Sequence, residues 1–237
     1  MIEKTIKGIK YRLDEENLTA KVLQKKGYEG DIIIPEIVVF KKVAYRVTSI
    51  DVSAFSGCSS LTSIVIPDGV TSIGVGAFSG CSSLTSIVIP DGVTSIAWRA
   101  FYNCSSLTSI VIPDSVTSIG RLAFRDCSSL TSMVIPDGVT RIGGRAFYGC
   151  SSLTEIVIPN SVTSIGYQAF YGCDSLTKVI IPASVTSIEE EAFSYCDELR
   201  TIRYGGTIAQ WKEIAHYRSV VFCPTRVVRC TDGDAKL

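Results

Sequence analysis

Histidine is nearly absent from this chain, which has one, His216, among its 237 residues. Ser–His and Cys–His mechanisms both need a base, so this scarcity argues against nucleophilic catalysis. The sequence also has no Cys-x-x-Cys pair, which together with the single histidine leaves zinc few ligands. We expect His216 to be a solvated helix residue beside Tyr217, and we expect no catalytic, metal or cofactor site.

Net charge and long apolar runs are missing as well. The 23 basic and 23 acidic residues cancel to a formal net charge of zero, so bulk electrostatics favour neither nucleic acid nor an anionic membrane. No apolar run approaches the roughly 18–20 residues that span a bilayer, and we expect no membrane insertion. Residues 1–5 show no stretch of signal-peptide type, which suits an intracellular protein or a mature secreted form.

The dominant feature of the sequence is repetition. Residues 81–103 read CSSLTSIVIPDGVTSIAWRAFYN, and residues 104–126 read CSSLTSIVIPDSVTSIGRLAFRD. Three columns keep this 23-residue step: Cys58, Cys81, Cys104, Cys127, Cys150, Cys173 and Cys196; Phe55, Phe78, Phe101, Phe124, Phe147, Phe170 and Phe193; Leu61, Leu84, Leu107, Leu130, Leu153, Leu176 and Leu199. Leu84, Ile87 and Ile89 form the L-x-x-L-x-L signature of a leucine-rich repeat. The pattern predicts a leucine-rich repeat solenoid, a strand-rich right-handed superhelix of the α/β class.

Each coil is too small to bury its own apolar stripe, so the coils must stack. Period-two alternation places Ile87 and Ile89 inside the coil and Ser86 and Val88 outside. Pro90 then ends the strand, because proline has no N–H for the ladder. A turn at 91–92, a second extended segment at 93–96 and a 3₁₀-like corner at 99–101 complete the coil. The predicted interior columns are those of Leu84, Ile87, Ile89, Val93, Ile96, Ala100, Phe101 and Cys104.

The two ends differ from the array. We predict an N-terminal cap with a partial repeat at 1–50, the repeat array at 51–203 and a C-terminal cap at 204–237. In the first cap, 11–13 and 20–23 flank a hairpin turn, and 32–38 is a degraded repeat followed by an insert at 40–46. In the second, Thr207 and Gln210 have capping-box spacing, which predicts a short amphipathic helix with Trp211 as an anchor, and then a strand at 226–230.

The repeat resembles the BspA-like, or treponemal-type, leucine-rich repeats, whose consensus runs close to L-x-x-I-x-I-P-x-x-V-x-x-I-G-x-x-A-F-x-G-C. The match extends from about Gly30 to Leu199, and the tail around Gly206-Thr207, Gln210-Trp211-Lys212 and 230–233 is similar to a closing module of that family. The resemblance implies a secreted or surface-bound bacterial protein that binds host or neighbouring-cell proteins. It carries over no binding residue, because the family has no shared site motif.

The repeated cysteines and aspartates are candidates for disulfide bonds and metal binding. Cysteines in one interior column would point in parallel, which suits a ladder of reduced thiols better than disulfides. Cys223 and Cys230 lie outside the array and could pair with each other. The turn aspartates are expected to bind nearby backbone N–H groups, with calcium as a weaker alternative, since each coil offers only one carboxylate: Asp68, Asp91, Asp114 and Asp137. Residues 74–76, Gly-Val-Gly, lack the lysine of a phosphate loop.

Surface variation indicates where a partner could bind. The outward strand positions, mostly Ser and Val, hardly change between coils, whereas the positions around the Ala-Phe corner vary. Aromatic residues and arginines gather at this corner, and these residue types dominate interface hot spots. The candidate partner-binding residues are Trp98, Arg99, Tyr102, Arg121, Arg125, Arg145, Tyr148, Tyr167 and Tyr171. Alternatively, these side chains only shield the phenylalanine column, and the Ser/Val sheet, expected to be concave, is the binding face.

Three classes of function follow from these observations. The favoured one is a non-enzymatic module for protein–protein interaction or adhesion, with a host extracellular-matrix or cell-surface protein as partner. The second is a carbohydrate-binding module that uses Trp98 and the tyrosines. An enzyme ranks third, and nucleic-acid binding would need more net positive charge than this chain carries.

Overall fold

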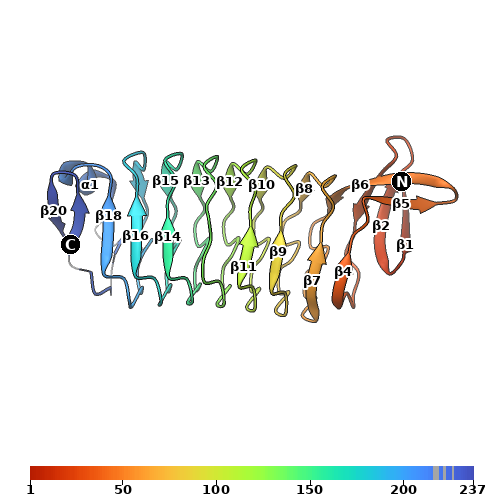
Figure 1. Ribbon diagram of the computed structural model, residues 1–237, viewed down its shortest axis with the longest axis horizontal. Helices are drawn as coiled ribbons and strands as arrows, with labels where there is room; N and C mark the ends of the chain where they lie inside the picture. The colour runs from red at the N-terminus through yellow and green to blue at the C-terminus, as the bar shows by residue number, and fades with distance from the viewer. Residues whose placement is uncertain (216–218, 221–222, 226) are drawn as a thin grey trace.

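The computed structural model describes residues 1–215, 219–220, 223–225 and 227–237. It shows a β-solenoid of about nine turns with coils of about 23 residues, and the two chain ends lie at opposite ends of the rod (Figure 1). The predicted solenoid is therefore confirmed. Each turn climbs through one strand, reverses after a proline, descends through a second extended segment and returns through a corner.

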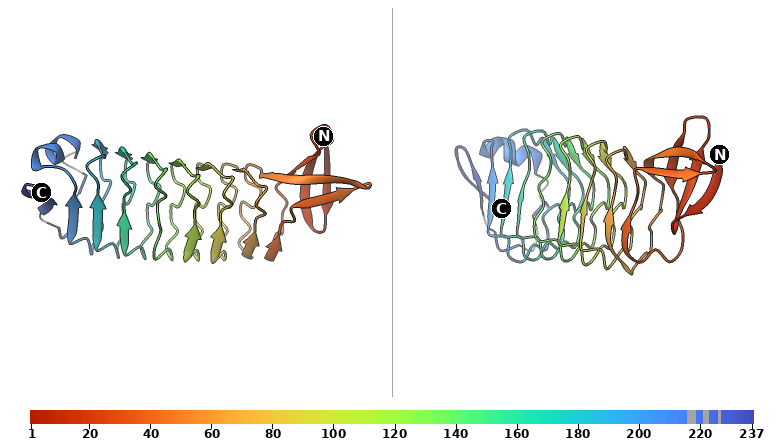
Figure 2. Two further views of the ribbon diagram at one scale, coloured as in Figure 1. Left: turned by 45° about the horizontal axis from the view of Figure 1, so that its top comes forward. Right: turned by 45° about the vertical axis from the view of Figure 1, so that its right-hand side comes forward.

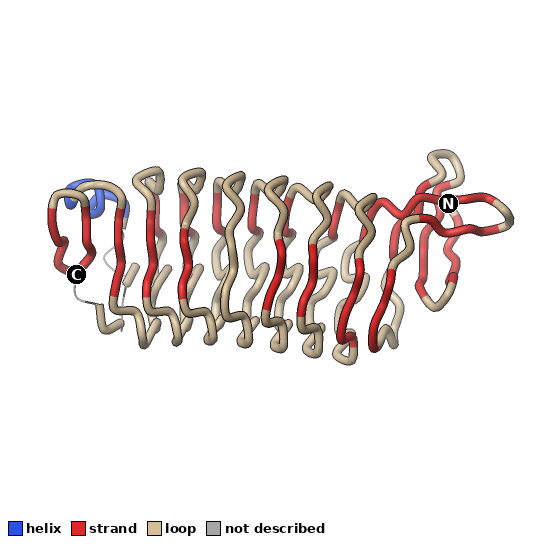
Figure 3. The backbone as a smooth tube through the Cα atoms, in the orientation of Figure 1, coloured by secondary structure: helices blue, strands red, loops and turns tan. Residues whose placement is uncertain are grey.

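The first strand of each turn forms the face shown at the front in Figure 3. Neighbouring strands pair in parallel, with Ile110 beside Ile87 and Val179 beside Ile156, so equivalent residues stack in rows. Residues 131–135 occupy the corresponding place between two of these strands without forming a strand. The strands of this front face are β4 (Gly30–Ile33), β7 (Leu61–Val65), β9 (Ser86–Val88), β11 (Ser109–Val111), β14 (Glu155–Val157), β16 (Lys178–Ile181) and β18 (Thr201–Tyr204).

The second extended segment of each turn builds a parallel ladder of two-residue strands behind the front face. Each strand keeps a buried isoleucine in register with the next, as Ile119 does with Ile142. These strands are β8 (Ser72–Ile73), β10 (Ser95–Ile96), β12 (Ser118–Ile119), β13 (Arg141–Ile142), β15 (Ser164–Ile165) and β17 (Ser187–Ile188). Two narrow sheets therefore enclose a single core along the length of the rod.

Phenylalanines run through this core as a continuous stack. Phe101 and Phe124 are fully buried, and their ring centroids lie 5.4 Å apart with an angle of 2° between the ring planes. The same parallel contact recurs from Phe55 to Phe193 at centroid distances of 5.1–5.4 Å. The interior columns predicted from the coil at 84–104 are buried in the array, except that Ile112 in the column of Ile89 is half-buried. The coil spacing thus sets the ring spacing.

The corner differs from the predicted 3₁₀-like segment. Ala100 N donates to the carbonyl of Ala97, Tyr102 N to that of Arg99 and Cys104 N to that of Phe101, so these 3₁₀-type bonds occur only at every second residue. Arg99 and Asn103, the third residues of the first and last of these turns, have φ angles of 55° and 56°. A residue in the left-handed region interrupts the helical repeat, which is why no 3₁₀ helix forms.

The N-terminal cap is a mixed sheet joined to the first turns. Its strands are β1 (Ile2–Ile6), β2 (Ile9–Asp14), β3 (Thr19–Val22), β5 (Ile37–Phe40) and β6 (Val43–Ile50). Within the cap, β3 and β6 pair in parallel and the other pairs are antiparallel. The predicted β2–β3 hairpin is present, the insert forms the β5–β6 hairpin, and β6 rejoins the repeat by pairing with β8. Strand β1, which pairs with β2, was not predicted.

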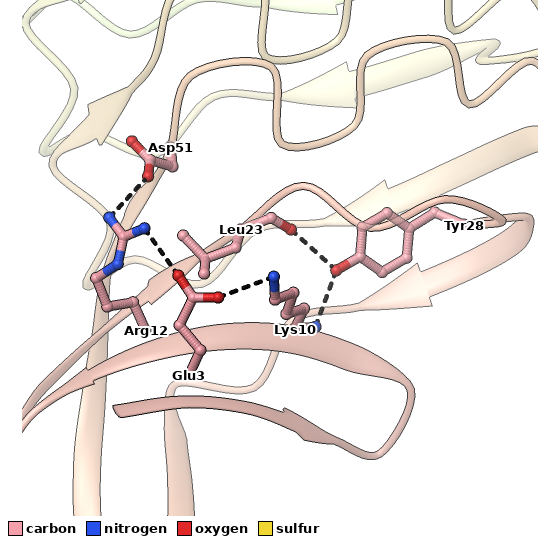
Figure 4. Close-up of polar contacts among 6 residues, drawn as sticks. All are labelled: Glu3, Lys10, Arg12, Leu23, Tyr28 and Asp51. Carbon is pink, nitrogen blue, oxygen red and sulfur yellow. Dashed lines mark hydrogen bonds and ion pairs between the residues drawn. The ribbon is translucent and has the colours of Figure 1, made fainter. Parts of the chain in front are cut away.

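Polar and aromatic contacts fix this cap to the array (Figure 4). Arg12 contacts Glu3 at 2.9 Å and Asp51, at the start of the first corner, at 3.4 Å. The Tyr28 hydroxyl donates to the Leu23 carbonyl at 3.1 Å and accepts from Lys10 N at 2.9 Å. The Tyr28 ring lies 4.8 Å from that of Phe55, so it covers the end of the phenylalanine stack.

The C-terminal cap closes the other end with α1 (Ile208–Ile214), β19 (Val227–Cys230) and β20 (Gly233–Lys236) (Figure 2). The predicted capping box is present: the Thr207 hydroxyl accepts from Gln210 N, and the Gln210 side chain accepts from Thr207 N. Trp211 is buried beside Tyr204, as expected of an anchor. The β19–β20 hairpin extends the front sheet past β18.

Candidate functional site

The corner that buries Phe101 also points its neighbours outward. Trp98 and Arg99 are exposed, and Tyr102 is half-buried. Arg99 N donates to the carbonyl of Arg121 at 3.2 Å, and similar bonds join corner to corner along the rod. Equivalent side chains on successive coils therefore lie one coil spacing apart and can contact one another.

The first group of contacts is centred on Arg99. Its guanidinium carbon lies 4.5 Å from the centroid of the Trp98 ring and 5.2 Å from that of Tyr102. Both distances are within the range of cation–π attraction. Trp98 is still 44% exposed, so this indole combines an open edge with one face covered by arginine.

Arg125 connects the next coils. Its guanidinium carbon lies 5.7 Å from the Tyr102 centroid and 4.7 Å from the Tyr148 centroid. Its Nε atom also donates to a carboxylate oxygen of Asp126 at 3.1 Å. The cation is thus held between two rings and neutralised in part by its sequence neighbour.

Tyrosines continue this line towards the C-terminal end. The rings of Tyr148 and Tyr171 stack in parallel at 4.8 Å, with 3° between their planes. Tyr195, a residue that the sequence analysis missed, lies 4.8 Å beyond Tyr171 at a tilt of 37°. It follows the phenylalanine by two residues rather than one, so column matching could not find it.

Arg145 forms a second, smaller group. Its guanidinium carbon lies 5.2 Å from the Tyr167 centroid, and its Nε atom donates to the side-chain oxygen of Gln168 at 2.7 Å. The Gln168 amide in turn donates to a carboxylate oxygen of Glu191. The Arg145 guanidinium therefore begins a series of side-chain hydrogen bonds that leads through Gln168 to Glu191 in the last complete coil.

Arg121 joins neither group. Its side chain is exposed, and it makes no ion pair or cation–π contact with any residue that the structure describes. Arg99 also lacks a carboxylate partner among those residues. The structure thus brings eight of the nine predicted residues into two contact groups and leaves one arginine free; we call the nine residues together with Tyr195 the Arg–aromatic stripe.

Charge changes sign along the same side of the rod. The four arginines of the stripe lie on consecutive coils, whereas the last complete coil carries Glu189, Glu190 and Glu191. A hollow of about 690 Å³ between β17 and α1 is lined by Tyr167, Glu189, Glu190 and Glu213, among others. A partner that covers the whole side would meet cations first and carboxylates last.

The described residues offer no cluster of metal ligands. Within 1–215, 219–220, 223–225 and 227–237, no three His, Cys, Asp or Glu side chains are grouped so that they could hold a metal ion. His216 lies outside the described residues. Gly74, in the segment that resembles a phosphate loop, is needed for packing, since a Cβ atom there would lie 2.5 Å from Val52 N.

The turn aspartates do not make the predicted contacts. Asp91 is exposed, and the turn after Pro90 is closed by the backbone, with Val93 N donating to the Pro90 carbonyl at 3.0 Å. The donor that the aspartate would have used is therefore already occupied. The equivalent donors of Val70, Val116 and Val139 are bonded to proline carbonyls in the same way.

The cysteines line the interior beside the phenylalanines. The Cys127 thiol donates to the carbonyl of Phe101 in the preceding coil at 3.1 Å, and the other repeat cysteines from Cys81 onwards do the same. Cys223 extends this ladder, because its thiol donates to the Phe193 carbonyl at 2.9 Å and its sulfur accepts from Cys196 N. The suggested Cys223–Cys230 disulfide is wrong: the Cys230 thiol donates to Val228 O instead.

The described residues include no helix that is long and apolar enough to cross a membrane. No curated protein sequence matches the chain significantly. Among solved structures, a leucine-rich repeat protein from Bacteroides ovatus is 31% identical with a TM-score of 0.83, and the match covers 94% of this chain and 57% of that one. The chain thus spans little more than half of that protein.

A leucine-rich repeat protein from T. pallidum, TpLRR, is 29% identical with a TM-score of 0.70, and the match covers 84% of this chain and 91% of that one. The family described as BspA type leucine rich repeat region matches residues 48–143 and 117–221, with six copies of the repeat. These two ranges together cover most of the chain. The protein belongs to the BspA-type leucine-rich repeat family.

Proposed function

We propose that this protein is a non-enzymatic binding module, secreted or displayed at a cell surface, which binds a host or neighbouring-cell protein through the Arg–aromatic stripe. The repeat scaffold suggests a protein-interaction module, and leucine-rich repeat solenoids are typically non-enzymatic. The observation that carries the choice of face is the contact geometry of the arginines. Arg99 and Arg121 present cations with no carboxylate partner among the described residues, and Arg99 lies over the partly exposed ring of Trp98.

This geometry favours a protein over a glycan. Sugar rings bind aromatic side chains by stacking on an open ring face. Tyr148 and Tyr171 cover each other, and Arg99 lies over Trp98, so several of these faces are already occupied. Exposed guanidiniums are suited to bidentate pairing with carboxylates of a protein partner.

A pull-down against extracellular-matrix and cell-surface proteins tests the proposal. The bait is compared with the triple variant Arg121→Glu, Arg125→Glu, Arg145→Glu and with the single variant Arg121→Glu. The single variant matters because Arg121 has no ion-pair or cation–π partner among the described residues, whereas reversal at Arg125 also places two carboxylates side by side. Arg46→Glu, on the N-terminal cap and 62% exposed at its side chain, controls for the change in charge.

The proposal predicts a captured protein that Arg46→Glu retains, Arg121→Glu weakens and the triple variant loses. The melting temperature of Arg121→Glu should equal that of the wild type, since this side chain makes no described contact to lose. A partner that the triple variant retains in full would refute the stripe as the binding face.

A further inference from the structure

The front face carries a row of exposed apolar side chains without charge. Val65, Val88, Val111, Val134 and Val157 are each more than half exposed, and Val134 reaches 82%. A second outward row runs parallel to them, with serines at positions 63, 86, 109 and 132 and then Glu155 and Lys178, which form an ion pair at 3.0 Å. A monomeric soluble protein rarely exposes so continuous an apolar patch unless something covers it.

Apart from the Glu155–Lys178 pair, whose two charges cancel, the face is charged at its two ends, and with opposite sign. At the N-terminal end Asp31 lies on β4, where its carboxylate accepts from the Thr62 and Ser63 hydroxyls at 2.8 and 2.7 Å. At the C-terminal end the valine row continues into Arg203 and Arg229, which are neighbours in register and both exposed. The face is therefore acidic at its start and basic at its end.

The turns that follow the front strands show the same asymmetry in charge. The residue after the strand-ending proline is aspartate in the first half of the array, at positions 68, 91, 114 and 137. In the second half the equivalent residues are Asn160 and Ala183, with Gly205 in the next turn. A body that covers the face with the reverse polarity would set most of these aspartates against uncharged residues instead of against other aspartates.

A second copy of this chain has that reverse polarity. We propose that the front faces of two copies pack against each other about a two-fold axis parallel to the strands, which passes through the turn that holds Val134. Val134 lies midway along the row, so the axis would place Val134 opposite itself and Val88 opposite Ile180 of the second copy. Asp31 would then lie near Arg203 and Arg229 of the other copy. The three aspartates at positions 68, 91 and 114 would face uncharged residues, and Asp137, next to the axis, would face its equivalent in the other copy.

The area suits a weak interface. At about 4.8 Å per strand, the row from Ile33 to Arg203 is roughly 35 Å long, and front strands of three residues, such as β9, to five residues, as in β7, are about 10 to 16 Å long. The footprint is then about 350–550 Å² per copy, or about 700–1,100 Å² for both, which reaches the roughly 1,000 Å² expected of a biological interface at its upper end.

Sedimentation velocity at protein concentrations up to about 100 µM tests the proposal, since interfaces at the small end of the standard range have Kd values near the micromolar level. The chain mass is 25.6 kDa, so a dimer has 2 × 25.6 = 51.2 kDa. Val134→Lys puts two lysines opposite each other on the axis and should leave only monomer. Val52→Lys, at a valine 56% exposed but outside the front face, should remain dimeric.

The register is tested by charge rescue. A mixture of Val134→Lys and Val134→Glu should restore the dimer, because the two side chains meet on the axis. A mixture of Val88→Lys and Val88→Glu should not, because Val88 faces Ile180 there. Wild-type protein of 25.6 kDa at every concentration, or a dimer that survives Val134→Lys with an unchanged circular dichroism spectrum, would overturn the proposal.

Discussion

The cysteine ladder should make the fold unusually sensitive to alkali. Burial among apolar groups raises the pKa of five repeat thiols above their ordinary value: Cys81, Cys104, Cys127, Cys150 and Cys173. In the unfolded chain the same thiols titrate at about 8.5. Above that pH the unfolded chain binds fewer protons than the folded chain, so the free energy of unfolding falls as pH rises.

The slope does not depend on how far each pKa is raised. As long as a thiol stays protonated in the fold, it costs about 1.4 kcal/mol of stability per pH unit above its unfolded pKa. Five thiols therefore remove about 7 kcal/mol between pH 7.5 and 9.5. Since domains are stable by about 5–15 kcal/mol, most of the folding free energy should be lost by about pH 9.5–10.

Urea denaturation followed by circular dichroism, with a reductant present and at pH values from 7.5 to 9.5, measures this loss. Cys127→Ala is the matched variant: its stability at neutral pH will be lower, but its slope should be shallower by about 1.4 kcal/mol per pH unit. A wild-type free energy of unfolding that changes by less than about 1.4 kcal/mol across this range would refute the reasoning, because even one buried neutral thiol predicts that much.

Three substitutions test the other packing arguments by urea denaturation. Phe124→Ala, in the middle of the ring stack, should cost about 3–5 kcal/mol, whereas Trp98→Ala should cost far less because its ring is partly exposed. Gly143→Ala should cost about 1–3 kcal/mol of stability, since its Cβ atom would lie 2.6 Å from Arg121 N. Gly144→Ala is the control, because a Cβ atom there meets nothing closer than 3.3 Å. Equal losses of stability in the two variants would contradict the packing argument. Thr207→Ala should cost about 1 kcal/mol by removing the cap of α1, and no measurable change would show that the capping box adds nothing.

The repeat made most of the fold predictable. A 23-residue period with alternating Ile87 and Ile89 identifies the coil, because stacking equivalent residues is the only way for so short a unit to bury them. The corner was less predictable. Its second left-handed position has glycine, Asn103 or Asp126 in most coils, a signal that could have been used, but the first holds residues as different as Arg99 and Leu122. The constraint there comes from the ladder between coils and not from side-chain preference.

Two features could not be predicted from the sequence: the place of Cys223, where the 23-residue period is interrupted, and the contacts within the stripe. Cys223 follows Cys196 by 27 residues instead of 23, because α1 is inserted in that turn, so the sequence placed it outside the ladder. The composition of the stripe was visible in the sequence, but its internal contacts were not. The Arg125–Asp126 pair and the Gln168–Glu191 hydrogen bond depend on side-chain conformation, which the aligned repeat sequences do not specify.

The most direct test of the proposed function is the affinity of the captured partner for Arg121→Glu, measured by surface plasmon resonance beside the wild type and Arg46→Glu. Binding through the stripe predicts that Arg121→Glu raises Kd at least about tenfold, or roughly 1.4 kcal/mol, while Arg46→Glu matches the wild type. Equal Kd values for all three proteins would contradict the account, because Arg121 is the cation that the fold leaves free to meet a partner.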